Sequence, residues 1–145
     1  MLRNLVGEVN FKKGIQTYYA TYFNSNATTN DFIAIMEEAS GQNLQTFFKQ
    51  WLYQPINPTI NGTWEYNAKT KKITIQVQQT QLGDMVFTIP VEIGYYKEGS
   101  TTPTILKMNV TTKELTQTFT VKGTPDKLEF DPWNILLCKS SLVKK

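Results

Sequence analysis

The sequence of 145 residues contains no histidine. This absence excludes histidine-based catalytic triads, histidine metal ligands and the most common general base at neutral pH. No Gly-x-Ser-x-Gly motif and no phosphate-binding loop motif occurs either, so no Ser or Thr stands in a known nucleophile pattern. We therefore predict that this chain carries no catalytic residue, no cofactor-binding residue and no metal ligand.

Cysteine is almost as scarce, because Cys138 is the only one. A disulfide within the chain is excluded. Cys138 follows the apolar run Ile135-Leu136-Leu137, and a thiol in such surroundings is typically buried and unreactive. We predict a structural role for this side chain.

Charge is also modest: charged residues make up 19% of the chain and the net charge is +3. The basic residues are scattered, apart from short clusters at Lys71-Lys72 and Lys144-Lys145. Nucleic-acid binding normally needs a clustered basic stripe, so we predict no nucleic-acid partner. No apolar run is long enough to span a membrane, and we predict no membrane segment.

The remaining composition is that of a globular chain, with 40% hydrophobic residues. A chain of this length is suited to one domain or two small ones and can bury a core without disulfides. The hydrophobic periodicity changes near residue 58, from a helical period of 3.6 to a strand period of 2. We therefore predict two domains, a helical one at 1–57 and a β-sandwich at 58–145.

The helical part opens within an amphipathic pattern that Gly7 ends, and three complete helices are predicted after it. The first spans about 11–23 with Asn10 as its cap, the second runs from Thr28 or Thr29 to Ser40 and stops at Gly41, and the third spans about 44–52 with Asn43 as its cap. The residues predicted to face inward are Phe11, Ile15, Tyr18, Tyr19 and Tyr22, then Phe32, Ile35, Met36 and Ala39, then Leu44, Phe47, Phe48, Trp51 and Leu52.

The second part predicts an antiparallel sandwich of six or seven short strands separated by turn residues. Alternation is clearest at Ile73, Ile75 and Val77. Pro90 lies in the next predicted strand and lacks an amide hydrogen, so that strand is expected at a sheet edge or with a bulge. The later inward sets are Leu106, Met108 and Val110; Leu115, Phe119 and Val121; Leu128 and Phe130; and Ile135 to Leu137.

Acidic and aromatic groups are the remaining candidates for a site. Glu37 and Glu38 are adjacent on a helix and point about 100° apart, which favours a solvated face over a shared proton or metal. The other acids show neither a zinc nor a calcium motif; they are Asp84, Glu92, Asp126, Glu129 and Asp131. The aromatic residues permit two interpretations, core packing or a platform for sugars or bases; they are Tyr18, Tyr19, Tyr22, Phe47, Phe48 and Trp51, with Trp64, Tyr66, Tyr95, Tyr96 and Trp133 in the second part.

A series of motifs in the first part has a recognisable order. They are Met1-Leu2-Arg3, Gly7-Glu8, Phe11-Lys12-Lys13-Gly14, Asn26 to Phe32, Glu37 to Leu44, Phe47 to Trp51 and Pro55 to Pro58. With them, residues 1–58 resemble the C-terminal end of the catalytic domain of family M1 zinc metallopeptidases, the gluzincin aminopeptidases. The second part resembles the family's small β-sandwich domain in position and strand pattern.

The resemblance implies a parent that removes N-terminal residues from peptides with zinc-activated water. The family's His-Glu-x-x-His zinc motif, its transition-state Tyr and its Gly-x-Met-Glu-Asn motif have no match in this sequence. The resemblance thus implies a non-catalytic C-terminal fragment of a zinc aminopeptidase (a hydrolase) that supports the catalytic domain and the peptide cleft. Its expected partner is the missing N-terminal catalytic portion, and the uncovered apolar face of the first helices predicts self-association.

Two other interpretations stay open at this point. The first is a free-standing Ig-like binding module for glycan or protein, which requires an exposed aromatic cluster on one face of the sandwich. The second is a small enzyme with an acidic site, which requires a pocket with converging carboxylates.

Overall fold

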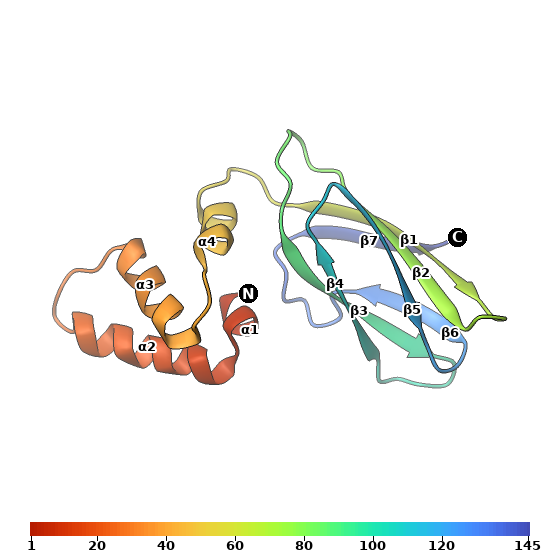
Figure 1. Ribbon diagram of the computed structural model, residues 1–145, viewed down its shortest axis with the longest axis horizontal. Helices are drawn as coiled ribbons and strands as arrows, with labels where there is room; N and C mark the ends of the chain where they lie inside the picture. Colours follow the sequence, from red (N-terminus) through yellow and green to blue (C-terminus); the bar gives the residue numbers. More distant parts are fainter. The chain divides into compact units, whose positions relative to one another are not determined.

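The computed structural model describes residues 1–145 and divides them into two compact units, Met1–Gln54 and Pro55–Lys145 (Figure 1). The first unit is helical and the second is built of strands, which confirms the predicted fold class. The predicted division at residue 57 stays a prediction about domains, because compactness alone does not test independent folding. The elements are α1 (Leu2–Val6), α2 (Glu8–Tyr22), α3 (Thr29–Ser40), α4 (Gln45–Leu52), β1 (Thr59–Asn67), β2 (Lys72–Gln79), β3 (Ile89–Lys97), β4 (Thr104–Val110), β5 (Glu114–Thr120), β6 (Pro125–Phe130) and β7 (Lys139–Lys144).

The junction between α1 and α2 is a single residue, Gly7, whose φ of 84° is a conformation that favours glycine. Helix α2 begins directly after it at Glu8, so the prediction that Asn10 caps this helix was wrong. Asn10 lies inside the first turn of α2, where its side-chain amide donates to the Val6 carbonyl at 2.9 Å. The side chain thus binds the last carbonyl of α1 instead of the first amides of α2.

Helix α3 has the ends that its sequence predicts. The Thr28 hydroxyl accepts from the Asp31 amide at 3.3 Å, and the Asp31 carboxylate accepts from the Thr28 amide at 2.8 Å. This reciprocal pair is a capping box, and it satisfies two amides at the helix start. Gly41 ends the helix in the left-handed region with φ 66°.

Helix α4 begins one residue later than predicted, because its N-cap position is Leu44. The Asn43 side chain nevertheless accepts from the Gln45 amide at 3.2 Å, as expected of a capping residue. The Leu44 amide donates to the Glu37 carboxylate of α3 at 2.7 Å, and the Gln45 side chain donates to the same oxygen at 3.3 Å. Glu37 therefore ties the start of α4 to the end of α3. None of the four helices is both long enough and apolar enough to cross a bilayer.

The core of the helical unit is small. Met36 is fully buried, and α2 comes close to it at Gly14, where an added Cβ would lie 2.5 Å from the Met36 sulfur. The buried members of this core are Val6, Ile33, Met36, Leu44 and Phe48, with Leu2, Leu5, Phe11, Phe32 and Phe47 packed at its margin.

The strands form two sheets, one in the order β5-β2-β1-β7 and one in the order β4-β3-β6. All neighbouring strands are antiparallel except β1 and β7, which are parallel. The predicted alternation in β2 is confirmed, since Ile73, Ile75 and Val77 are buried. The other buried hydrophobic side chains of this unit are Ile60, Trp64, Phe87, Ile89, Val91, Ile93, Tyr95, Leu106, Met108, Val110, Val121 and Leu128, and the buried polar ones are Gln79 and Asp131.

The strand that contains Pro90 is central in its sheet, which contradicts the expected sheet edge. Pro90 pairs with Asn109 of β4 on one side. The pairing with β6 on the other side begins only at Ile93, so no ladder bond is required from Pro90. The irregularity of β3 lies farther along, between Tyr96 and Lys97.

The last predicted inward strand, Ile135 to Leu137, is a loop, and β7 begins only at Lys139. Asp131 explains the difference. Its carboxylate accepts from the Ile135 amide at 3.0 Å and from the Leu136 amide at 2.7 Å. These amides are satisfied inside the loop and need no neighbouring strand.

Candidate functional site

The carboxylates are dispersed over the fold. No group of three or more His, Cys, Asp or Glu side chains lies close enough to hold a metal ion. Glu37 accepts from the Leu44 amide at the start of α4, and Asp131 accepts from two amides of its own loop, while Glu38 is exposed. Glu92 pairs with Lys107 at 3.3 Å. Each engaged acid therefore has a local structural partner.

Three side chains on β3 and β6 form a packed group. The Tyr96 hydroxyl donates to the Glu129 carboxylate at 2.9 Å, and the Lys127 ammonium lies 3.3 Å from that carboxylate and 4.3 Å from the centre of the Tyr96 ring. The hydrogen bond raises the pKa of Tyr96 and lowers the pKa of Glu129. Both shifts move these groups away from neutral pH, so neither is prepared for proton transfer there.

Cys138 is half-buried. Burial, and then the charge of Asp131, raise the pKa of its thiol to about 11. The thiol is therefore protonated at neutral pH, and a protonated thiol is a weak nucleophile and a weak metal ligand.

Most of the candidate aromatic residues are buried or half-buried, which favours packing over a binding platform. Tyr18 meets Phe32 edge to face at 5.2 Å, and Phe32 meets Phe48 in the same way at 6.1 Å. In the sandwich, Trp64 and Tyr95 are buried, whereas Trp133 is exposed. Sequence alone does not give these exposures, because they depend on which strand neighbours which.

One edge of α2 departs from the prediction. Tyr19 and Ile15 were expected to face inward, but their side chains are 65% and 41% exposed. Phe23, one turn beyond Tyr19 and just after the helix, is 60% exposed. The predicted stripe was too wide, since Tyr18 and Tyr22 take the inward positions beside α3. We call Ile15, Tyr19 and Phe23 the α2 edge.

A hollow of about 430 Å³ lies beside the α2 edge. Four of its seven lining residues are aromatic, and one of these, Tyr22, is also hydrogen-bonded to Asp31. Burial, followed by that bond, raises the pKa of Tyr22. The hollow offers apolar ring surface and a few neutral polar groups, without an acid–base pair. Its lining residues are Tyr18, Tyr19, Tyr22, Phe23, Asn24, Ser25 and Ala27.

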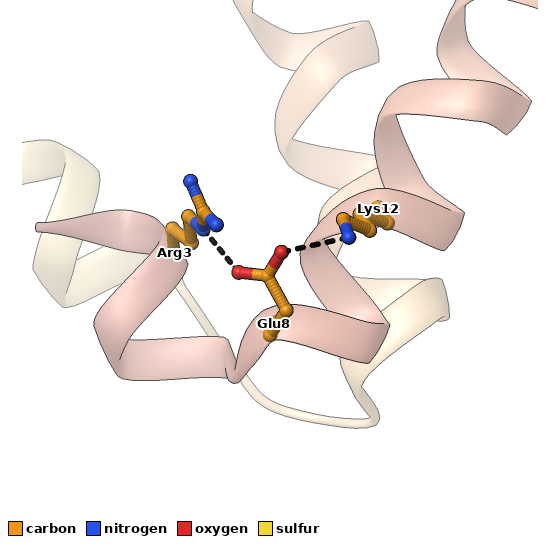
Figure 2. Close-up of polar contacts among 3 residues, drawn as sticks. All are labelled: Arg3, Glu8 and Lys12. Atoms are coloured by element: carbon orange, nitrogen blue, oxygen red, sulfur yellow. Dashed lines mark hydrogen bonds and ion pairs between the residues drawn. The ribbon is translucent and has the colours of Figure 1, made fainter.

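A small ionic cluster occupies the other end of α2 (Figure 2). The Glu8 carboxylate accepts from the Arg3 guanidinium and lies 3.0 Å from the Lys12 ammonium. The Arg3 hydrogen bond lowers the pKa of Glu8, and the same bond raises the pKa of Arg3. All three side chains are exposed, so this cluster adds little to stability.

Comparison with known proteins finds sequence similarity to one peptidase family. The family model described as "Peptidase family M1 domain" matches residues 1–51, which include all four helices up to Trp51. Aminopeptidase N of Escherichia coli (strain K12) is 32% identical over 160 residues, which cover 100% of this chain and 18% of that protein. Aminopeptidase N of Haemophilus influenzae is 31% identical over 107 residues, which cover 70% of this chain and 12% of that protein.

Among solved structures, aminopeptidase A of Legionella pneumophila in complex with aspartic acid matches 85% of this chain with a TM-score of 0.69. At 20% identity this likeness shows a shared fold. It covers 14% of that protein, so the chain spans less than a fifth of the length of each relative described here.

Proposed function

Residues 1–51 belong to the M1 peptidase family, and we propose that the chain is a non-catalytic part of an M1-like zinc aminopeptidase. In this role it supports the catalytic domain and the peptide cleft, while other residues of the whole protein carry out the hydrolysis of N-terminal peptide bonds. The observation that carries the proposal is the similarity to aminopeptidase N, which runs through the helices and the sandwich alike.

Zinc, which the family implies, does not fit the residues of this chain. Protein zinc sites use three or four ligands from Cys, His, Asp and Glu. Here histidine is absent, Cys138 is the only cysteine and belongs to no group of three potential ligands, and the carboxylates do not gather. In the proposed function the zinc ligands therefore belong to the other part of the protein.

The residues of the chain contribute rigidity in this proposal. The capping box of Thr28 and Asp31 fixes one end of α3, and the bond from Leu44 to Glu37 fixes α4 against the other end. Secondary-structure ends held in this way present their side chains at constant positions, which a catalytic cleft requires of its surroundings.

A graft into aminopeptidase N of Escherichia coli tests the proposal. The segment of that enzyme that aligns with this chain is replaced by residues 1–145, and release of N-terminal residues from a peptide is measured with and without a zinc chelator. We expect chelator-sensitive activity in the graft and none in the isolated chain at the same molar concentration. The matched control is the enzyme with the segment deleted, which should be inactive.

Two results contradict the proposal. One is zinc-dependent peptidase activity of the isolated, purified chain. The other is a graft that folds, as judged by cooperative unfolding, but has no activity. The alternative of a glycan- or protein-binding sandwich is not proposed, because Trp64 and Tyr95 are buried and Tyr66 and Tyr96 are half-buried, which leaves Trp133 as the one exposed member of the predicted aromatic set.

A further inference from the structure

We propose that the α2 edge is the surface through which the helical unit packs against the remainder of an M1-like catalytic domain. This inference rests on the proposed function and adds to it the residues of the contact. The occupant is a stretch of that domain with an apolar centre, and one of its side chains enters the hollow beside Tyr19 and Phe23.

The geometry of the edge is that of a contact surface. Ile15, Tyr19 and Phe23 follow one another at intervals of four residues, so they lie in one row along the helix. The rings of Tyr19 and Phe23 lie 5.4 Å apart, which presents them as one continuous aromatic surface. Large aromatic side chains around a pocket are the usual anchors of tight protein contacts.

The same face of α2 becomes polar toward the start of the helix, where Glu8 and Lys12 lie within about 20° of Tyr19 around the helix axis (Figure 2). An occupant that lies along the whole face must therefore be apolar opposite Tyr19 and Phe23 and polar opposite Glu8 and Lys12. This gradient fixes the direction in which the occupant lies on α2, since the reverse direction would bury the Glu8 carboxylate against apolar groups.

The remainder of the catalytic domain is the occupant that the chain itself favours. The family match covers α1 to α4 up to Trp51, yet these helices enclose a core of only five buried apolar residues. A core of that size is small for a peptidase domain, and it leaves apolar surface open on the α2 edge, at Val9 and at the end of α4, where Leu52 and Tyr53 are exposed. The α2 edge is the one of these surfaces that lies beside a hollow. A second copy of this chain is the competing occupant, and the experiment below separates the two.

The test compares an edge variant, Tyr19→Ser with Phe23→Ser, with the control Val9→Ser. Val9 is on the same helix and is even more exposed, at 79%, but it lies about 80° around the helix from Tyr19. In the isolated chain both variants should leave the unfolding midpoint nearly unchanged, because the replaced side chains face solvent. In the graft the edge variant should lower the midpoint by roughly 5 °C, whereas Val9→Ser should not.

Hydroxyl-radical footprinting with mass spectrometry provides a second measurement that needs no substitution. Oxidation of Tyr19 and Phe23 should fall severalfold between the isolated chain and the graft, while oxidation of the exposed Trp133 should not. This comparison remains decisive if the edge variant of the graft fails to fold.

The outcomes separate this inference from the proposed function. An inactive but folded graft with a protected edge contradicts the proposed function and supports the packing surface. An active graft in which Tyr19 and Phe23 stay as reactive as in the isolated chain overturns the packing surface and leaves the proposed function intact. A third result would favour a second copy of the chain as the occupant. In that case Tyr19 and Phe23 become protected in the isolated chain as its concentration rises, and they are not protected in the graft, which overturns the proposed packing surface.

Discussion

Gln79 pairs with Phe87 through its side chain as one strand pairs with another through its backbone. The Phe87 amide donates to Gln79 Oε1 at 2.9 Å, and Gln79 Nε2 donates to the Phe87 carbonyl at 2.8 Å. Gln79 Nε2 also donates to the Thr112 carbonyl at 3.1 Å, and Gln81 Nε2 donates to Gln79 Oε1 at 3.2 Å. One buried amide thus fixes the connection between β2 and β3 from inside.

Replacement of Gln79 by Ala should destabilise the chain by about 2 kcal/mol or more, because the buried Phe87 amide and carbonyl both lose this partner. The neighbouring Gln78→Ala is the control. Gln78 faces solvent, where its amide meets Glu114, so this change should stay within about 0.5 kcal/mol. Urea unfolding of the three proteins measures both values, and equal midpoints for the two variants would show that the side-chain pairing is not stabilising.

Gly14→Ala tests the close approach of α2 to Met36. Alanine favours a helix by about 1 kcal/mol over glycine, yet the new methyl group would lie 2.5 Å from the Met36 sulfur. Overpacking of this kind costs about 1 to 3 kcal/mol, so we expect a net loss of stability or no gain. The control is Gln16→Ala on the exposed side of α2, which should be neutral or slightly stabilising.

A double-mutant cycle completes that test. Met36→Ala alone should be destabilising, because it opens a cavity in the helical core. When Met36 is already Ala, Gly14→Ala should lower the free energy of unfolding by less than it does in the natural chain, because the Met36 sulfur that the new methyl group would meet is gone. Strictly additive changes in unfolding free energy would mean that Gly14 and Met36 do not constrain one another.

The sequence predicts those parts of the fold that depend on contacts between residues close together in the chain, and it does not predict those that depend on distant residues. Thr28, Asp31 and Gly41 fix both ends of α3 through contacts a few residues apart, and these ends were predicted correctly. The parallel pairing of β1 with β7 joins residues far apart in the chain, and no local pattern indicates it. Pro90 was misplaced for the same reason, since its tolerance depends on where β6 begins to pair with β3.

The candidate surface on α2 was missed for a different reason. Helical periodicity identifies a direction along a helix but not how much of that face the neighbouring helix covers. Tyr18 and Tyr19 both fit the predicted stripe, yet only Tyr18 meets a partner ring on α3, which is Phe32. A sequence signal existed in the excess of aromatic residues from Tyr18 to Phe23, which is more than one small core needs.

Acid should weaken the start of α3. The backbone hydrogen bond from Thr28 lowers the pKa of Asp31 below its ordinary value of 3.8. A carboxyl group with a lowered pKa stabilises the fold above the unfolded pKa, and that stabilisation is lost as pH falls through the folded pKa. The difference in unfolding free energy between the natural chain and Asp31→Asn should therefore shrink as pH falls from 7 to below 3.8. A difference that stays constant with pH would mean that the charge of Asp31 plays no part.

Cys138 should react slowly in the folded chain. A pKa of about 11 in place of 9.0 means about a hundredfold less thiolate at pH 8, and the thiolate is the form that alkylating reagents attack. Iodoacetamide should therefore modify the native chain far more slowly than the same chain in urea.

The raised pKa of Cys138 also predicts a loss of stability in alkali. Because its pKa is higher in the folded chain, the thiol loses its proton at a lower pH in the unfolded chain, and the free energy of unfolding should decrease as pH rises from 9 toward 11. Cys138→Ala lacks this group and should show a smaller decrease over that range; an equal decrease in both proteins would assign the alkaline instability to other groups, such as the tyrosines with raised pKa values.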